Sequence, residues 1–75
     1  EITISDVNWI EEPQDFPYKM QARYRHQGDL VNAVIDALSN GRYQVTFDEA
    51  QEALASGQSL VMYQDRVCLG GGVIE

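Results

Sequence analysis

Hydrophobic and polar residues alternate along most of this chain, and the clearest alternation spans residues 18–26, YKMQARYRH. The residues on one side of this segment are Lys19, Gln21, Arg23 and Arg25. The residues on the other side are Met20, Ala22, Tyr24 and His26. Because successive side chains of a strand point to opposite faces, the segment is predicted to be a half-buried strand with one basic face.

The segment 30–38, LVNAVIDAL, fits two periods. Strand-like alternation is shown by Val31, Ala33, Ile35 and Ala37. A helical stripe is also formed, by Leu30, Val34 and Leu38. The β-branched content and the turn-forming residues 39–41, SNG, followed by RYQVTF, favour a hairpin of two strands. The side chains of the return strand that are expected to face the core are Tyr43, Val45 and Phe47.

The segment 48–57, DEAQEALASG, combines good helix formers with acids in the first turn and a glycine at the end. It predicts a short helix or 3₁₀ turn, with a loop as the alternative.

Two further strands are predicted at 59–64 and 66–74, joined by a tight turn through Asp65. The start of the chain, with Val7, Trp9 and Ile10 ahead of the turn-forming residues 11–17, adds another strand, and its large aromatic, Trp9, is expected to close the core.

Five or six short strands in 75 residues predict an all-β fold, a small antiparallel β-barrel of about six strands that fills residues 1–75 as a single domain. Closure removes the exposed edges that an open sheet would have. The chain starts with Glu1 rather than Met, which suggests a fragment of a longer protein. The chain has one cysteine, which excludes an internal disulfide. One cysteine and one histidine are too few ligands for a structural zinc site, so no metal is expected.

A net charge of -7 argues against indiscriminate binding of nucleic acid, because attraction to phosphates depends on clustered Lys and Arg. Any contact with RNA must therefore come from a local patch. No apolar run approaches the roughly 18 residues of a membrane span, and no signal peptide is evident, so no membrane partner is expected. A cytoplasmic location is compatible with the single free cysteine.

The end of the chain, VCLGGGVIE, contains three consecutive glycines beside the single cysteine. A phosphate-binding loop would need a helix after the glycines, and only three residues follow Gly72. The glycines are therefore interpreted as a bend or a close backbone approach in a strand. Cys68 is interpreted as a small buried hydrophobe, with a thiolate nucleophile as the less favoured alternative. His26 is expected on the surface or in a hydrogen bond.

Three of the five basic residues, Lys19, Arg23 and Arg25, lie on one face of the strand predicted at 18–26. This basic stripe could contact a phosphate backbone, with Tyr24 available for stacking or hydrogen bonding. The alternative is that the stripe balances acidic turns through surface ion pairs, each of which contributes little. The carboxylates around residues 47–50, FDEA, are interpreted as solvated turn residues rather than a cation site.

The motifs ARYRHQ, VTFDEAQEALASGQSLVMYQ and RVCLGGGVIE together resemble the C-terminal domain of bacterial tRNA-specific 2-thiouridylases, which have the older name tRNA (5-methylaminomethyl-2-thiouridylate)-methyltransferases. The resemblance covers nearly the whole chain. It implies a β-barrel similar to the second-domain barrel of translation factors. It also implies a larger parent enzyme, in which an N-terminal PP-loop domain uses ATP with magnesium to adenylate the wobble uridine of tRNA and a cysteine persulfide then delivers sulfur.

The resemblance further implies that this barrel contacts tRNA and contains no catalytic residue. The positions that match the family's tRNA contacts are Arg23, Tyr24 and Gln58, and Lys19 and Arg25 are auxiliary candidates for phosphate contacts. Implied partners are tRNA, the enzyme's own N-terminal and central domains, and a sulfur-relay donor protein. No cofactor is expected in the barrel itself. The competing hypothesis is a structural or protein-interaction barrel that packs on its catalytic domain without contacting RNA.

Overall fold

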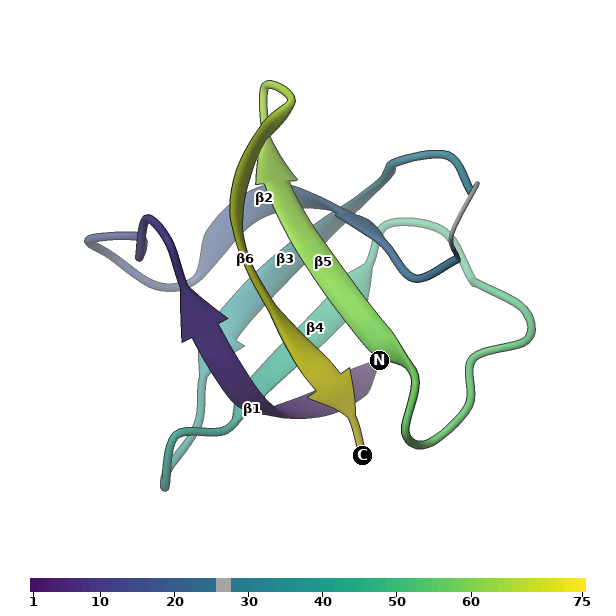
Figure 1. Cartoon of the computed structure of the whole chain (residues 1–75), viewed down its shortest axis with the longest axis horizontal. Helices are drawn as coiled ribbons and strands as arrows, with labels where there is room; N and C mark the ends of the chain where they lie inside the picture. The colour runs from purple at the N-terminus through teal and green to yellow at the C-terminus, as the bar shows by residue number, and fades with distance from the viewer. Residues whose placement is uncertain (26–27) are drawn as a thin grey trace.

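The computed structural model describes residues 1–25 and 28–75, and His26 and Gln27 lie outside the described residues. Its regular secondary structure consists of six strands, shown in Figure 1. The strands are β1 (Ile2–Trp9), β2 (Tyr18–Arg23), β3 (Val31–Ala37), β4 (Tyr43–Phe47), β5 (Ser59–Gln64) and β6 (Val67–Ile74). None of the described residues belongs to a helix that is long and apolar enough to cross a bilayer.

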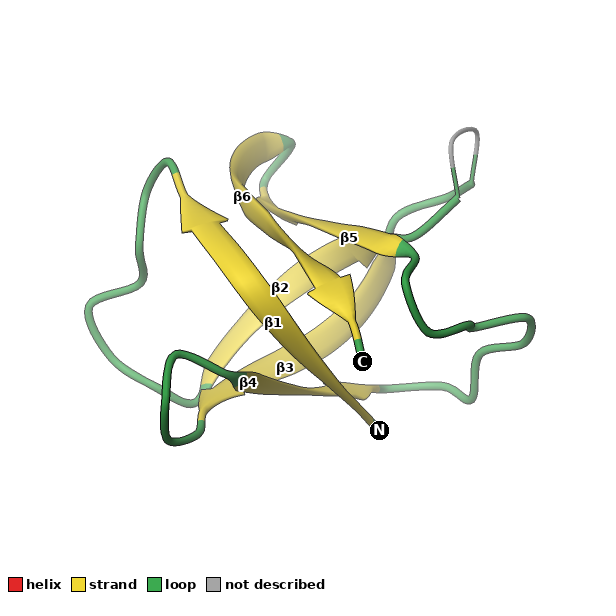
Figure 2. Cartoon of the chain, turned by 60° about the horizontal axis from the view of Figure 1, so that its bottom comes forward, coloured by secondary structure: helices red, strands yellow, loops and turns green. Residues whose placement is uncertain are grey.

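All six strands pair antiparallel and close into a barrel in the order β1-β4-β3-β2-β5-β6. Figure 2 shows β1 crossing in front of β2 and β3, with the two chain ends close together. The backbone N–H of Glu75 donates to the carbonyl of Thr3 at 2.9 Å, which ties these ends to each other. The prediction of an antiparallel all-β barrel of about six strands is confirmed.

The barrel interior is apolar because each strand directs alternate side chains inward. The buried core consists of Ile4, Met20, Ala22, Ala33, Ile35, Val45, Leu60, Met62, Leu69 and Ile74. Completely burying one large aliphatic side chain of this kind stabilises a fold by roughly 1.5–3 kcal/mol. Within β2 the predicted alternation is confirmed, with Met20 and Ala22 inside and Lys19 exposed.

Both predicted hairpins are present. Asp65 and Arg66 join β5 to β6 with φ angles of 50° and 69°, and Asn40 and Gly41 lie between β3 and β4 with φ angles of 60° and 71°. Two consecutive positive φ angles are typical of the tight turn whose twist matches that of the flanking strands. These local turns place β3 beside β4 and β5 beside β6.

The glycine run lies in the middle of β6, between β1 and β5. A Cβ atom on Gly70 would lie 2.2 Å from the carbonyl oxygen of Asn8, and one on Gly72 would lie 2.9 Å from a methyl group of Val7. Gly70 also has a φ of 153°, which side chains rarely permit. The interpretation of the glycines as a close backbone approach is confirmed, because a side chain would collide with β1.

Four details differ from the sequence predictions. Residues 48–57 form bends and turns and no helix, since Leu54 packs against the core and Ala53 and Gly57 have positive φ angles. The strand predicted over 18–26 ends at Arg23. The strand predicted at the start of the chain ends at Trp9, so Ile10 lies outside it and is 73% exposed, whereas Trp9 packs against the core as expected. Cys68 is half-buried, and its neighbour Leu69 points into the core in its place.

Candidate nucleic-acid interface

The outer face of the β2–β5 pair presents the basic part of the molecule. Lys19 and Arg23 alternate with the buried Met20 and Ala22, so both basic side chains point away from the core. β5 lies beside β2 with Tyr63 opposite Gln21 and Val61 opposite Arg23. We refer to the outward-facing residues of these two strands, Lys19, Gln21, Arg23, Val61 and Tyr63, as the β2–β5 outer face.

Arg23 is held on this face by Tyr63. Its Nη2 atom donates a hydrogen bond of 2.9 Å to the Tyr63 hydroxyl, and its Cζ atom lies 5.4 Å from the centre of the Tyr63 ring. Both side chains are half-buried. Tyr63 therefore holds the guanidinium in two ways, by a cation–π contact with its ring and by a hydrogen bond to its hydroxyl.

The basic stripe is not neutralised by ion pairs within the described part of the chain. The ion pair found there joins Arg42 and Glu75, with Nη2 and Oε1 2.8 Å apart and a second hydrogen bond from Nε. This contact raises the pKa of Arg42, chiefly through the hydrogen bond to Glu75, and lowers the pKa of Glu75 through the same bond. The alternative role of the stripe, to balance acidic turns through ion pairs, is therefore not supported for Lys19, Arg23 and Arg25.

Tyr24 follows β2 directly and lies at the rim of the barrel. Its ring packs against the core and meets the Phe47 ring edge-on, with ring centres 6.2 Å apart. Its hydroxyl lies 3.0 Å from Oε1 of Gln51 and 3.1 Å from the carbonyl of Glu52, which accept its proton. Tyr24 thereby fastens the segment 48–58 to the barrel. Arg25 lies against the Tyr24 ring, with Cζ 5.6 Å from the ring centre.

Gln58 closes the far end of the same segment. Its Oε1 accepts a hydrogen bond of 2.7 Å from the backbone N–H of Ala55, and its own N–H donates to the Ala55 carbonyl at 3.2 Å. Its backbone carbonyl accepts from the N–H of Ile74 at 2.8 Å. The Nε2 group of Gln58 has no hydrogen-bond partner among the described residues, so two donors remain for a ligand.

The structure places the predicted contact residues near the same end of the β2–β5 pair, with Arg23 on the outer face, Tyr24 packed against the core and Gln58 just before β5. Val61 of β5 lies opposite Arg23, and Gln58 immediately precedes β5. The backbone of Gln58 is therefore three residues, or roughly 10 Å along the strand, from the position opposite Arg23. Sequence reasoning missed Tyr63 and Gln51, the partners of Arg23 and Tyr24. Alternation within SLVMYQ could have placed Tyr63 outward, but nothing in the sequence pairs β5 with β2.

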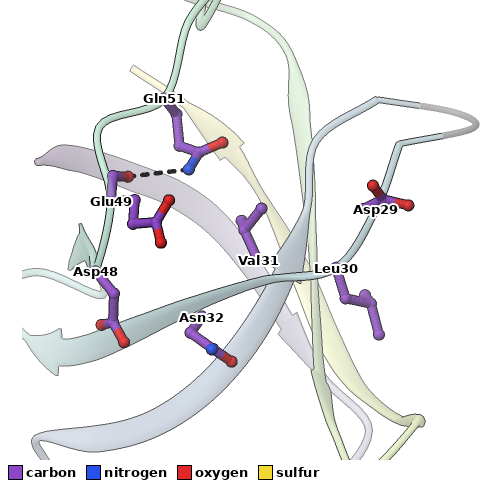
Figure 3. Close-up of a pocket in the computed structure, with 7 residues that line it drawn as sticks. All are labelled: Asp29, Leu30, Val31, Asn32, Asp48, Glu49 and Gln51. Carbon is purple, nitrogen blue, oxygen red and sulfur yellow. Dashed lines mark hydrogen bonds between the residues drawn. The ribbon is translucent and has the colours of Figure 1, made fainter.

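The hollow in Figure 3 has a volume of about 290 Å³ and lies between the start of β3 and the segment after β4. Its lining includes the carboxylates of Asp29, Asp48 and Glu49, and Gln51 Nε2 donates to the Glu49 carbonyl across 2.9 Å. Carboxylates repel phosphate, so this hollow does not suit a nucleotide. Among the described residues, no group of three or more His, Cys, Asp and Glu is arranged to hold a metal ion.

Cys68 is a free, half-buried cysteine opposite Tyr63 in the β5–β6 pair. A thiolate nucleophile requires a base or a cation beside it. The hypothesis that His26 activates Cys68 as a nucleophile falls outside the described residues, because they do not include His26.

The class of protein follows from the barrel and from its sequence relatives together. Residues 1–74 match the family described as the aminomethyltransferase beta-barrel domain, so the chain belongs to that family. The match covers every strand described above.

The similar proteins are named tRNA-specific 2-thiouridylase MnmA. The one from Protochlamydia amoebophila is 39% identical over 75 residues, which cover 100% of this chain and 20% of that protein. The one from Idiomarina loihiensis is 42% identical over 72 residues, which cover 92% of this chain and 19% of that protein. The chain thus spans about a fifth of the length of these relatives. The resemblance to the C-terminal barrel of 2-thiouridylases is confirmed.

Proposed function

We propose that this barrel is the tRNA-contacting C-terminal domain of a tRNA 2-thiouridylase and that the RNA backbone lies along the β2–β5 outer face. The observation that carries the proposal is Arg23, whose guanidinium is fixed on this face by Tyr63 and has no carboxylate at ion-pair distance among the described residues. A guanidinium in this setting can donate two parallel hydrogen bonds to one phosphate.

The charge of the chain limits how the barrel binds. With five basic and twelve acidic residues, the domain as a whole repels phosphate. Binding must therefore be local, and the barrel orients tRNA more than it supplies affinity. Lys19, exposed on the same face, and Arg25, exposed beyond the end of β2, extend the positive region along the strand direction.

The three principal residues have different roles in this proposal. Arg23 binds phosphate directly. Gln58 uses its Oε1 atom to fold the turn and presents its Nε2 donors to the RNA backbone or a base. Tyr24 acts mainly by fastening the segment 48–58, since its hydroxyl proton is already engaged with Gln51 and Glu52.

The parent reaction is part of the proposal because the chain covers about a fifth of its relatives. In the parent, ATP with magnesium would activate the wobble uridine, and sulfur would come from a cysteine persulfide loaded by a relay protein. Within the described residues, neither the glycine run, packed against β1, nor the acidic hollow of Figure 3 fits the phosphates of ATP. In this proposal the chemistry belongs to the N-terminal domains, and the barrel contributes no catalytic residue.

The test is a salt series of tRNA binding by the intact enzyme with Arg23→Ala. The variant is expected to bind about tenfold more weakly, the cost of one charge-assisted hydrogen bond. Its plot of log affinity against log salt should flatten by about one unit for each phosphate that the protein no longer binds. Arg42→Ala is the matched control, because it removes the same charge from an arginine already paired with Glu75.

Unchanged affinity and slope in Arg23→Ala would contradict the proposal. They would favour the competing role, in which the barrel packs on its catalytic domain without contacting RNA.

A further inference from the structure

Tyr63 is the aromatic residue of the β2–β5 outer face. It lies on β5 between Gln21 of β2 and Cys68 of β6, and its side chain points outward because Met62, next to it, is completely buried. Its ring is half-buried, while its hydroxyl reaches the Arg23 guanidinium. A tyrosine in this position combines a fixed ring with a polar end at the surface.

The hydrogen bonds of this pair leave several donors unused. The Tyr63 oxygen accepts from Arg23, so its own proton is left to donate, and no acceptor for that proton occurs among the described residues. Arg23 has five N–H donors, and one of them is engaged with Tyr63. The two side chains together thus present several N–H groups and one O–H group, with one positive charge and no competing carboxylate at ion-pair distance in the described chain.

We infer that Tyr63 and Arg23 form one composite phosphate-binding site, in which the Tyr63 hydroxyl donates to the same phosphate group that the Arg23 guanidinium binds. This inference rests on the proposed function and adds a residue to it. The arrangement suits a phosphodiester because each of its two free oxygens accepts hydrogen bonds and carries shared negative charge.

Tyr63 contributes in a second way, by fixing Arg23 before RNA arrives. A free arginine side chain loses rotamer freedom when it binds, and this loss weakens binding. The hydrogen bond and the cation–π contact hold the guanidinium on the face in advance. The direct and the positioning contributions can be separated because only the positioning contribution requires Arg23.

The experiment measures binding of an unmodified tRNA transcript to the intact enzyme carrying Tyr63→Phe. The variant keeps the ring and removes the hydroxyl, and it is expected to bind roughly fivefold more weakly, the effect of removing one hydrogen bond. Its salt slope should equal that of the unaltered enzyme, since tyrosine is neutral, whereas Arg23→Ala flattens the slope.

Tyr43→Phe is the matched control. The Tyr43 hydroxyl accepts a hydrogen bond of 3.2 Å from Trp9 Nε1, and β4 lies across the barrel from β5. The control therefore loses a comparable hydroxyl on the far side and should bind tRNA as the unaltered enzyme does. Equal losses of affinity in Tyr43→Phe and Tyr63→Phe would show a general effect of destabilisation and overturn the inference.

The double variant distinguishes failure of the inference from failure of the proposed function. In the Arg23→Ala background, Tyr63→Phe should still weaken binding twofold or more, because the direct hydrogen bond from Tyr63 to phosphate is still present there to be removed. If Arg23→Ala weakens binding and Tyr63→Phe has no effect in that background, the composite site is wrong and the proposed function stands. If neither single variant changes affinity, both are wrong.

Discussion

The β6 glycine run and the β2–β5 outer face use their residues in opposite ways. In β6, Gly70 and Gly72 lie where a side chain would strike β1. On the β2–β5 outer face, Arg23 projects from the sheet and has donors to spare. The first region brings strands together, and the second presents side chains to a partner.

The comparison shows that a distinctive motif need not mark the site of function. Glycines beside a cysteine suggest a phosphate loop with a nucleophile, yet the structure leaves no room for a ligand between Gly70 and Asn8. The basic strand has an ordinary alternating pattern, yet it carries arginine without a carboxylate partner among the described residues. Substitutions in β6 should therefore affect stability first, and substitutions on the outer face should affect binding first.

The largest effect is expected for Gly70→Ala. The new Cβ would lie 2.2 Å from the Asn8 carbonyl oxygen, so β1 or β6 must shift, and the free energy of unfolding should fall by about 3 kcal/mol. Urea unfolding measures this loss. Gly41→Ala is the control, because Gly41 also has a positive φ but no atom within 4 Å of the added Cβ, and it should cost about 1 kcal/mol. Equal losses at both positions would show that the close approach is unimportant.

Tyr24→Ala should have the next largest effect. It removes a half-buried ring that contacts Phe47 and the hydroxyl that fastens Gln51, and we expect a loss of about 2 kcal/mol. Tyr24→Phe keeps the ring and should lose about 1 kcal/mol. Hydrogen exchange of residues 48–58 should quicken in Tyr24→Phe. Unchanged exchange there would mean that the hydroxyl does not hold the segment.

A smaller effect is expected at Gln58, where two substitutions separate folding from binding. Gln58→Ala leaves the Ala55 N–H without its acceptor and should lower the free energy of unfolding by about 1 kcal/mol. Gln58→Glu keeps an acceptor oxygen but removes the Nε2 donors and adds a negative charge. It should preserve stability and weaken tRNA binding several-fold in a binding titration. Normal affinity in Gln58→Glu would exclude Gln58 as an RNA contact.

The smallest effect concerns the exposed ion pair between Arg42, just before β4, and Glu75, just after β6. The pKa of Glu75 is lowered in the folded state, so the pair stabilises the fold above the ordinary glutamate pKa of 4.5, and this contribution is lost as the pH falls through the lowered value. Arg42→Ala should thus be slightly less stable than the unaltered chain at pH 7 and equal to it at strongly acidic pH, as thermal unfolding would show. A difference that grows on acidification would contradict this sign.

The sequence predicted the parts of the fold that depend on neighbouring residues. The turns at Asn40–Gly41 and Asp65–Arg66 sit between alternating strands, so both hairpins were predictable. Alternation also indicated the inward and outward sides of β2. The helix predicted over 48–57 from its helix propensity is absent, because a short isolated helix is only marginally stable and the contacts of Leu54 with the core outweigh this propensity.

The site was only partly predictable because its geometry depends on pairing between distant strands. Arg23 and Tyr63 are forty residues apart, and they meet because β2 pairs with β5 in a register set by barrel closure. The use of the Tyr24 hydroxyl was hidden for the same reason, since Gln51 is brought to it by the path of the segment 48–58. The resemblance indicated Arg23, Tyr24 and Gln58, and the structure distinguishes their environments.

The most direct test of the central claim is hydroxyl-radical footprinting of the intact enzyme with and without tRNA. Tyr63 on the β2–β5 outer face and Tyr43 on β4 are half-buried tyrosines on opposite sides of the barrel, which makes them matched reporters. We predict that tRNA slows oxidation of Tyr63 and leaves that of Tyr43 unchanged. Oxidation of Tyr63 at the same rate with and without bound tRNA would contradict the account.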